Sequence, residues 1–267
     1  MPRPNRRPSD QLRGRDGRQL AQEKAKQHWC PHSLRKGEIM RRGLAVIAIA
    51  ATGLMAMPAT AQTTHTCFGE PATLVGTAGN DELRGDVVVG LGGSDELHGR
   101  LVCSGKGNDG PIDGDMGADG GPGDDSEISG DALSIGGPGN DEFFDFGGFG
   151  SARQVWRGGP GDDAYNADEG DDVFYGGAGN DGTGDDQEGG FTGDRDVQYG
   201  GSGNDRLAGG LGRDKLFGGD DDDRLRAGKV VFADGVEDLL DGGAGFDTCV
   251  IHPGDRAVNC EDVTVMG

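Results

Sequence analysis

Single apolar side chains recur along the middle of the chain, each two residues after an aspartate. Glycine-rich polar segments of about six residues separate them, so the pattern has neither the 3.6-residue period of a helix nor the alternation of a long strand. We therefore expect very short strands between tight turns, each strand giving one side chain to a narrow interior. These positions are Leu83, Leu97, Phe143, Tyr165, Phe174, Leu207, Leu216 and Leu225, with Trp156 and Leu240 in degenerate units.

The polar segments share the pattern GGxGxD. Partial copies start at Gly76, Gly90, Ser104, Gly114 and Gly218. At the chain's own glycine and aspartate frequencies about 0.3 full copies would arise by chance, so composition alone does not produce the repeat. Adjacent glycines permit backbone conformations with positive φ, which indicates tight turns. The full copies begin at Gly120, Gly136, Gly158, Gly176, Gly200, Gly209 and Gly242.

Two nonapeptides would form one coil, with a turn at each end and a short strand on each face. Stacked coils would bring the turns of repeats n and n+2 to roughly 4.8 Å, the spacing of neighbouring strands. The aspartates of such a stack would repel one another unless a hard divalent cation lay between them. Carboxylate and backbone carbonyl oxygens in a flexible arrangement favour calcium over magnesium.

The segments GGPGDDAYN, GGAGNDGTG, GGSGNDRLA and GGLGRDKLF resemble the nonapeptide of the RTX, or haemolysin-type calcium-binding, repeat family. The resemblance covers residues 76–250 with interruptions. It implies an all-β fold, a right-handed parallel β-roll or β-helix solenoid with interrupting loops, that binds several Ca²⁺ ions in its turns. By position, it implies that the side-chain ligands are Asp81, Asp95, Asp109, Asp125, Asp141, Asp163, Asp181, Asp205, Asp214, Asp223 and Asp247.

The spacing of the aspartates predicts which of them share an edge of the roll. Asp163 and Asp181 are separated by two full repeats, as are Asp205 and Asp223, so each pair should face one row of calcium ions. Asp196 could pair with Asp214 on the opposite edge, and Asp172 should lie there without a clear partner. Other intervals, such as the one from Asp181 to Asp205, do not fit the nine-residue frame. We expect inserted loops there, which would disturb the adjoining calcium sites.

Composition limits what the chain can bind. Glycine supplies 55 residues, and only 33% of residues are hydrophobic, so any core must be thin. Residues 62–267 hold 43 of the 47 acidic residues but only 13 of the 25 basic ones, a formal net charge of −30. Nucleic acid and anionic membranes are therefore poor partners, and cations are good ones. Disorder in the absence of ligand, or a merely solvating acidic surface, are the alternative readings, but neither predicts a strict spacing.

The N-terminal region has the pattern of a secretory signal. Arg41 and Arg42 precede the apolar run 44–57, and Ala59-Thr60-Ala61 offers a cleavage site. We expect a signal peptide at 40–61 and export from a bacterial cell, with no membrane span after cleavage; a retained anchor is the alternative. Residues 1–39 would be a gene-model extension, with Met40 as the start, or an atypical disordered n-region. The mature chain would comprise cap segments at 62–75 and 251–267 around the repeats.

Processing would also remove Cys30 and leave four cysteines, an even number that suits an oxidising compartment. Four cysteines allow three pairings. Proximity in sequence favours Cys67 with Cys103 and Cys249 with Cys260. No CxxC pattern points to a thiolate metal site, which is the alternative.

The motifs of common hydrolases are absent from the sequence. It contains no HExxH or GxSxG motif, and His65, His98 and His252 are most simply surface residues. We therefore expect a secreted, non-enzymatic calcium-binding protein that folds when calcium binds and interacts with a cell surface or matrix polysaccharide. The alternative is a polysaccharide-active enzyme or carbohydrate binder on a parallel β-helix. Exposed aromatics such as Trp156, Tyr165 or Tyr175 beside carboxylates in one groove would favour that alternative.

Overall fold

The computed structural model describes residues 64–144, 153–166, 170–183, 195–228 and 235–267, all within the compact unit Thr60–Gly267. The expected Met40 start, signal peptide and cleavage site lie outside the described residues. In the described part of the chain, no helix is long and apolar enough to cross a membrane.

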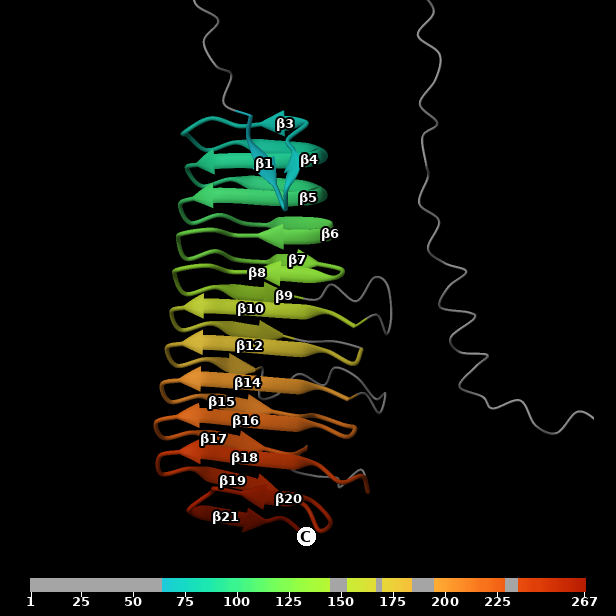
Figure 1. Cartoon of the computed structure of the whole chain (residues 1–267), viewed down its shortest axis with the longest axis vertical. Helices are drawn as coiled ribbons and strands as arrows, with labels where there is room; N and C mark the ends of the chain where they lie inside the picture. The colour runs from blue at the N-terminus through green and yellow to red at the C-terminus, as the bar shows by residue number, and fades with distance from the viewer. Residues whose placement is uncertain (1–63, 145–152, 167–169, 184–194, 229–234) are drawn as a thin grey trace, which may run out of the picture. The chain divides into compact units, whose positions relative to one another are not determined.

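The described residues form strands and turns without any helix. Nineteen strands belong to one sheet that winds as a parallel β-solenoid of about nine turns (Figure 1). The strands are β1 (Thr66–Cys67), β2 (Glu70–Pro71), β3 (Leu74–Val75), β4 (Glu82–Gly92), β5 (Glu96–Lys106), β6 (Ile112–Asp119), β7 (Ile128–Gly130), β8 (Leu133–Ile135), β9 (Glu142–Phe144), β10 (Val155–Pro160), β11 (Ala164–Asn166), β12 (Val173–Ala178), β13 (Gly182–Thr183), β14 (Val197–Ser202), β15 (Arg206–Ala208), β16 (Lys215–Asp220), β17 (Arg224–Arg226), β18 (Leu239–Ala244), β19 (Thr248–Ile251), β20 (Arg256–Val258) and β21 (Asp262–Val265).

The strands stack in two parallel columns, which we call the first face and the second face. The first face contains the even-numbered strands β8 to β20, and the second face contains the odd-numbered strands β7 to β21. The longer strands β4, β5 and β6 run through both faces. The expected parallel β-roll is therefore confirmed.

Two edges connect the faces, and they differ in sequence, although one full GGxGxD copy, 209–214, lies on the side that returns to the first face. The turns from the first face to the second carry the GGxGxD pattern, as in 158–163 between β10 and β11, and we call this side the glycine edge. The turns that return to the first face vary in length, and we call that side the variable edge. Val155 of β10 pairs with Val173 of β12, but Val173 pairs with the more distant Val197 of β14. The predicted coil of two nonapeptides is thus one of several coil lengths.

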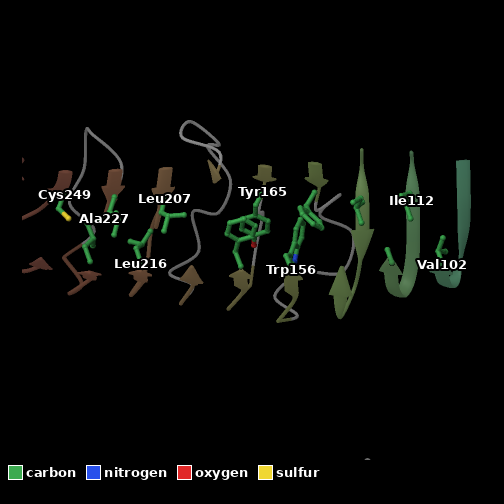
Figure 2. Close-up of a cluster of buried hydrophobic side chains, with 14 of the residues drawn as sticks. Val102, Ile112, Trp156, Tyr165, Leu207, Leu216, Ala227 and Cys249 are labelled. Carbon is green, nitrogen blue, oxygen red and sulfur yellow. The ribbon is translucent and has the colours of Figure 1, made fainter. Parts of the chain in front are cut away.

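The core is a single file of inward side chains between the two faces (Figure 2). All ten predicted apolar positions are buried except Leu83, which lies in the first coil and is partly buried. The rings of Phe143, Trp156, Tyr165 and Phe174 pack against one another in sequence, with centroids 4.3–5.6 Å apart. Because each repeat gives only one side chain to the interior, a chain with few hydrophobic residues still fills its core.

Polar residues replace apolar ones at some inward positions of the core, such as Ser134 on β8. The inward positions on β13 and β14 are held by Thr183 and Gln198, both buried. Gln198 donates from Nε2 to the carbonyl oxygen of Ala208 at 2.8 Å, and the Ala208 N–H donates to Oγ1 of Thr183 at 2.7 Å. These hydrogen bonds satisfy the side chains of Thr183 and Gln198, so the break in the apolar file at these two residues is not left unpaired.

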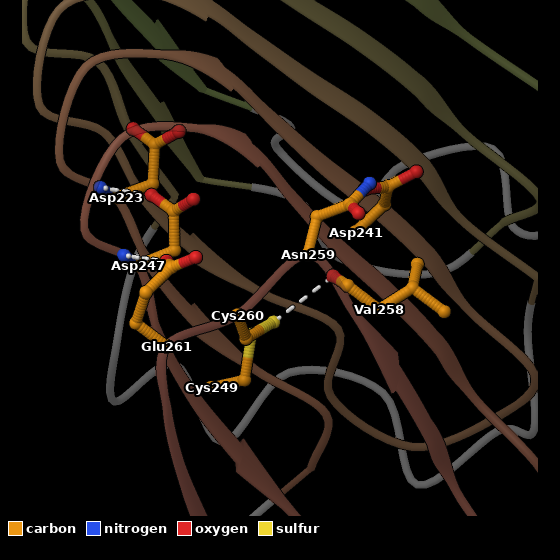
Figure 3. The surroundings of a disulfide bond; sticks show 8 residues. All are labelled: Asp223, Asp241, Asp247, Cys249, Val258, Asn259, Cys260 and Glu261. Carbon is orange, nitrogen blue, oxygen red and sulfur yellow. Dashed lines mark hydrogen bonds between the residues drawn. A yellow bond between two sulfur atoms is a disulfide. The ribbon is translucent and has the colours of Figure 1, made fainter.

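Both predicted disulfides are present. Cys67 bonds to Cys103 and ties the hairpin β1–β2 to β5 over a small second cluster that includes Val87, Val89 and Leu101. Cys249 bonds to Cys260 next to the last coil (Figure 3). The solenoid therefore has one covalent clamp near each end.

The glycines of the glycine edge are required by close stacking of the turns. Gly179 has a φ of 136°, and a Cβ there would overlap the carbonyl oxygen of Gly161 in the preceding coil. The Gly161 N–H in turn donates to the Ala178 carbonyl at 2.7 Å. A side chain at these positions would be strained and would also separate the turns.

Candidate metal centre

An unbroken row of carboxylates runs along the glycine edge. Ten successive turns each place one aspartate at the same position, and its backbone N–H donates to Oδ1 of the aspartate in the next coil at 2.8–2.9 Å, ending on Oε2 of Glu261. We call this row the first ladder. Its members are Asp81, Asp95, Asp109, Asp125, Asp141, Asp163, Asp181, Asp205, Asp223, Asp247 and Glu261.

We expected inserted loops to disturb the aspartate sites next to them, and for the hydrogen bonds of the first ladder this expectation is wrong. Consecutive members are separated by 14 to 24 residues along the chain, yet the hydrogen bonds between them are alike. In the sequence, the added residues follow the second-face strand of one coil and precede the first-face strand of the next, so they do not interrupt the glycine-edge turns. Asp181 and Asp205, 24 residues apart, are as well paired as Asp163 and Asp181, 18 residues apart.

A second, shorter ladder lies at the variable edge. The N–H of Asp172 donates to Asp196, that of Asp196 to Asp214, and that of Asp214 to Asp238, each to Oδ1 at 2.9 Å. Asp238 then donates to Oδ1 of Asp255 at 3.1 Å. The predicted pairing of Asp196 with Asp214 is confirmed. The expectation that Asp172 lacks a clear partner is wrong, because a longer coil brings Asp196 beneath it.

Sequence reasoning missed three ladder members: Asp238, Asp255 and Glu261. Their segments lack the paired glycines of the repeat, so the glycine pattern did not find them. Each of them nevertheless lies two residues before an inward side chain, namely Leu240, Ala257 and Val263. The spacing of an acidic residue and an apolar one was therefore the signal that could have identified them.

The first-ladder carboxylates are buried with one oxygen unsatisfied. From Asp95 to Asp247 each aspartate is at most 3% exposed. Oδ1 accepts the backbone N–H of the previous coil, whereas Oδ2 has no hydrogen-bond partner in the described structure. A buried ionised oxygen without a partner costs several kcal/mol. This row of oxygens therefore favours a bound cation or a proton.

The pKa values reflect this burial. Loss of hydration raises the pKa of Asp163 to about 8, although the N–H of Asp141 partly opposes the shift. The same cause raises the pKa of Asp125, Asp205 and Asp223 to about 7. It raises the pKa of Asp141 and Asp181 to about 6. Without a cation, much of the ladder would therefore take up protons near neutral pH.

Backbone carbonyl oxygens lie beside the unsatisfied carboxylate oxygens. A Cβ on Gly176 would overlap Oδ2 of Asp181 and lie 2.6 Å from the carbonyl oxygen of Gly200 in the next coil. Gly158 has the same relationship to Oδ2 of Asp163 and the Gly176 carbonyl. The first glycine of each repeat thus leaves room for a carboxylate and a carbonyl oxygen to converge.

This arrangement fits calcium. Within the described ranges, no three His, Cys, Asp or Glu side chains group closely enough to hold a metal by themselves. A cation in the ladder would therefore be held by aspartates such as Asp163 and Asp181 together with turn carbonyls, and calcium accepts six to eight oxygen ligands of both kinds. Bound there, the ion supplies positive charge against the desolvated carboxylates.

The residue before each first-ladder aspartate forms a third, exposed row that runs in the opposite direction. The Asn180 N–H donates to Oδ1 of Asp162 in the preceding coil at 2.7 Å, and the Asn204 N–H donates to Oδ1 of Asn180 at 2.9 Å. Asp222 continues the row. A groove of about 750 Å³ follows these side chains, with Arg206 and Arg224 in its lining.

Within the described ranges, the aromatic side chains named in the sequence analysis do not line one groove beside carboxylates. Trp156 and Tyr165 are fully or almost fully buried in the core. Tyr175 and Tyr199 are exposed on the first face, and they stack with Phe217 at centroid distances of 5.0 and 4.9 Å and interplanar angles of 3° and 9°. Tyr199 is therefore covered on both faces by neighbouring rings, and the guanidinium of Arg157 lies 5.8 Å from the ring centroid of Tyr175.

The two ends of the ladders differ from the middle. Oδ2 of Asp81 in the first coil accepts the N–H and the hydroxyl of Thr77 at 2.6 and 2.9 Å. At the other end Asp223, Asp247 and Glu261 lie in line beside the Cys249–Cys260 bond (Figure 3). In the second ladder Oδ2 of Asp172 accepts the Tyr165 hydroxyl at 3.3 Å. The interior of the first ladder, Asp95 to Asp247, is therefore the best candidate for metal binding.

Comparison with known proteins agrees with this geometry. A family model described as the RTX calcium-binding nonapeptide repeat matches four copies, in residues 72–95, 157–181 and 199–229. Neither the curated proteins nor the solved structures include a match to the chain. The matched segments contain Asp81, Asp95, Asp163, Asp181, Asp205 and Asp223 of the first ladder. The chain therefore forms a β-solenoid that contains RTX calcium-binding nonapeptide repeats.

Proposed function

We propose that this chain is a secreted, non-enzymatic protein that binds several calcium ions in its glycine-edge turns and folds as it binds them. The observation that carries this proposal is the first ladder, in which successive buried aspartates each keep one carboxylate oxygen without a partner. These carboxylates are buried in the stacked turns and shielded from water, and bound calcium would neutralise their charge.

Calcium would also act as the folding switch. Residues 62–267 carry a formal net charge of −30, and the core is one side chain wide. A ligand that binds only the folded chain stabilises it by RT ln(1 + [L]/Kd) for each site. Extracellular calcium sites commonly have Kd values of about 10⁻⁴ to 10⁻³ M, which leaves them empty inside a cell and filled outside.

Two features support export. The pattern at residues 40–61 is that of a secretory signal peptide, and both disulfides of the solenoid need an oxidising compartment to form. Outside the cell, the protein would act as an interaction module for a cell-surface or matrix polysaccharide. The groove along Asp162, Asn180, Asn204 and Asp222 offers that partner a row of polar groups with the period of the coils.

A calcium titration of the exported chain tests the proposal. Far-UV circular dichroism should change from coil to β-structure as calcium rises into the millimolar range, with a smaller hydrodynamic radius and a new calorimetric transition. Magnesium at the same concentrations serves as the control. It should have a smaller effect, because Mg²⁺ requires a nearly ideal octahedral arrangement of ligands at shorter distances. A spectrum and radius that do not respond to calcium would rule out the folding switch.

Enzymatic activity is tested separately, with the calcium-loaded protein and uronate polymers in a reducing-sugar assay. We expect no release of reducing ends. Release that depends on the folded state would replace the proposal by the polysaccharide-active alternative.

A further inference from the structure

Among the described residues, the last coil of the solenoid, which contains β21, has exposed core positions. On β21, Val263 and Val265 continue the inward file of Cys249 and Ile251, with which they are in register. Cys249 and Ile251 are 0% and 8% exposed, whereas Val263 and Val265 are 44% and 60% exposed. In the described part of the chain, β21 pairs only with β19, so its outer edge offers free backbone groups as well as apolar side chains.

Within residues 64–267, the first described coil also has an unpaired strand edge on the second face. The segment Glu82–Gly85 of β4 pairs with β5 below it, and the described residues contain no strand that pairs with its other edge. Its inward side chain, Leu83, is only partly buried, although Leu97 beneath it is fully buried. The hairpin β1–β2 packs on the cluster around Val87 and Leu101 and does not pair with this segment.

The first ladder has a direction, and its two ends are complementary. Each member donates its N–H to the carboxylate of the next coil, and Glu261 is the last acceptor. At the other end, Asp81 donates to Asp95, and the hydrogen bonds that Asp81 accepts from Thr77 both end on Oδ2. A coil placed before Asp81 could donate to Oδ1 of Asp81, as every other coil does to its successor.

We propose that the C-terminal end of one copy binds the N-terminal end of a second copy, with β21 pairing in parallel with Glu82–Gly85. Extending the register of β19 and β21 places Val263 over Leu83 and Thr264 beside Arg84. Glu261 would then donate its N–H to Oδ1 of Asp81, so the first ladder would continue from one copy into the next.

A tail-to-tail dimer is less compatible with these observations. In such a dimer, Glu261 of one copy would face Glu261 of the other. The two carboxylates would then lie opposite each other, and the first ladder of the second copy would run in the reverse direction. A head-to-tail contact uses two different surfaces and leaves each new end open, so it produces linear assemblies and not a closed dimer. Because two acidic chains must meet, the contact should need calcium or high ionic strength.

The first test compares assembly of the full exported chain with that of two end variants in millimolar calcium. In sedimentation velocity, the average mass of the unmodified protein should rise with concentration. Val263→Asp with Val265→Asp should stay monomeric, because the charges enter the apolar contact. Thr264→Asp is the matched control: its side chain points outward beside Arg84, and assembly should persist. A monomeric unmodified protein at every concentration, or an unaffected double variant, would overturn the proposal.

A cross-linking test identifies the ends and does not depend on folding of the double variant. Thr264→Cys and Arg84→Cys are prepared separately, mixed in calcium and oxidised. A disulfide between the two variants is expected, because neighbouring outward positions of paired strands are within disulfide reach. Disulfide dimers of Thr264→Cys alone, or no dimer in the mixture, would contradict a head-to-tail contact. Circular dichroism of each variant in calcium verifies that the solenoid is folded.

Discussion

The backbone N–H of Asp163 donates to Oδ1 of Asp181, 18 residues further along the chain, at 2.9 Å. This bond uses one oxygen of the carboxylate and leaves the other buried without a partner. The same relationship recurs from coil to coil, so the charge of each aspartate is held in place by the backbone of its neighbour. Four predictions test what this arrangement does.

Asp163→Asn should weaken calcium binding at the glycine edge. Asparagine can still accept the Asp141 N–H at Oδ1, but it removes the charge and the unsatisfied oxygen. We expect the calcium concentration at which half of the protein is folded, the calcium midpoint, to rise roughly tenfold or more. Even the loss of a residue that only supports a metal ligand commonly weakens metal binding about tenfold. The midpoint is read by circular dichroism during a calcium titration.

The neighbouring residue provides the control. Asp162→Asn makes the same change in charge on an exposed side chain, and asparagine occupies this position in the next coils at Asn180 and Asn204. Its calcium midpoint should stay close to that of the unmodified protein. Equal shifts for the two variants would mean that net charge, and not the buried oxygen, sets the affinity.

Acidification should stabilise the fold when calcium is absent. Burial raises the pKa of Asp163 to about 8 and that of Asp125, Asp205 and Asp223 to about 7, above the ordinary value of 3.8. A carboxyl with a raised pKa binds its proton more tightly in the folded state, so its contribution is full below pH 3.8 and is lost as the pH rises through 6 to 8. Far-UV circular dichroism in a calcium chelator at several pH values measures the folded fraction, which should rise as the pH falls.

With calcium present, the dependence should be reversed. Protons and calcium compete for the same oxygens, so the calcium midpoint should increase as the pH falls from 8 to 6. A calcium-free stability that rises with pH would contradict the assignment of raised pKa values to the first ladder.

Gly179→Ala should destabilise the folded protein by about 2 kcal/mol or more, because alanine is strained at a φ of 136° and its Cβ would overlap the Gly161 carbonyl. Gly182→Ala, three residues later on β13, is the matched control. The nearest atom to a Cβ there lies 4.0 Å away, and the φ is not positive. Thermal unfolding in saturating calcium compares the two, and equal effects would refute close stacking of the turns.

Loss of the Cys249–Cys260 bond should loosen the last coil. The bond closes a short loop, for which chain entropy gives about 3 kcal/mol. In Cys249→Ser with Cys260→Ser, hydrogen exchange should accelerate in β20 and β21 first, while β10 to β16 remain protected in calcium. The double variant of Cys67 and Cys103 should instead affect β1, β2 and β5. Uniform acceleration along the solenoid would show that the coils unfold together.

The sequence could predict most of the architecture because each repeat carries its own structural information. Leu207, Leu216 and Leu225 follow their aspartates by two residues, and this spacing identified the core positions correctly. Gly161 and Gly179 identified the turns. Local rules of conformation were therefore enough to predict the core and the turns, because each repeat packs against further copies of the same repeat.

The extent of the ladders could not be predicted in the same way. A fixed nine-residue frame made the 24-residue interval between Asp181 and Asp205 look like an interruption, whereas parallel pairing places these residues in adjacent coils. Asp238 and Glu261 lack glycine turns and enter the ladders only through stacking of their strands. Which residues share a row depends on coil length, and that is a property of the whole coil.

The unequal edges have a practical consequence for engineering. Coils of 14 to 24 residues all preserve the bonds of the first ladder, so the variable edge can accept added sequence without a change in the spacing of the metal-binding turns. Gly210, between β15 and β16, has a φ of 92° and no atom within 4 Å of the position of a Cβ. A peptide inserted after Gly210 would be displayed at the variable edge beside the second-ladder residue Asp214, on the other side of the coil from Asp205 and Asp223. The calcium response of the first ladder would then report whether the host had folded.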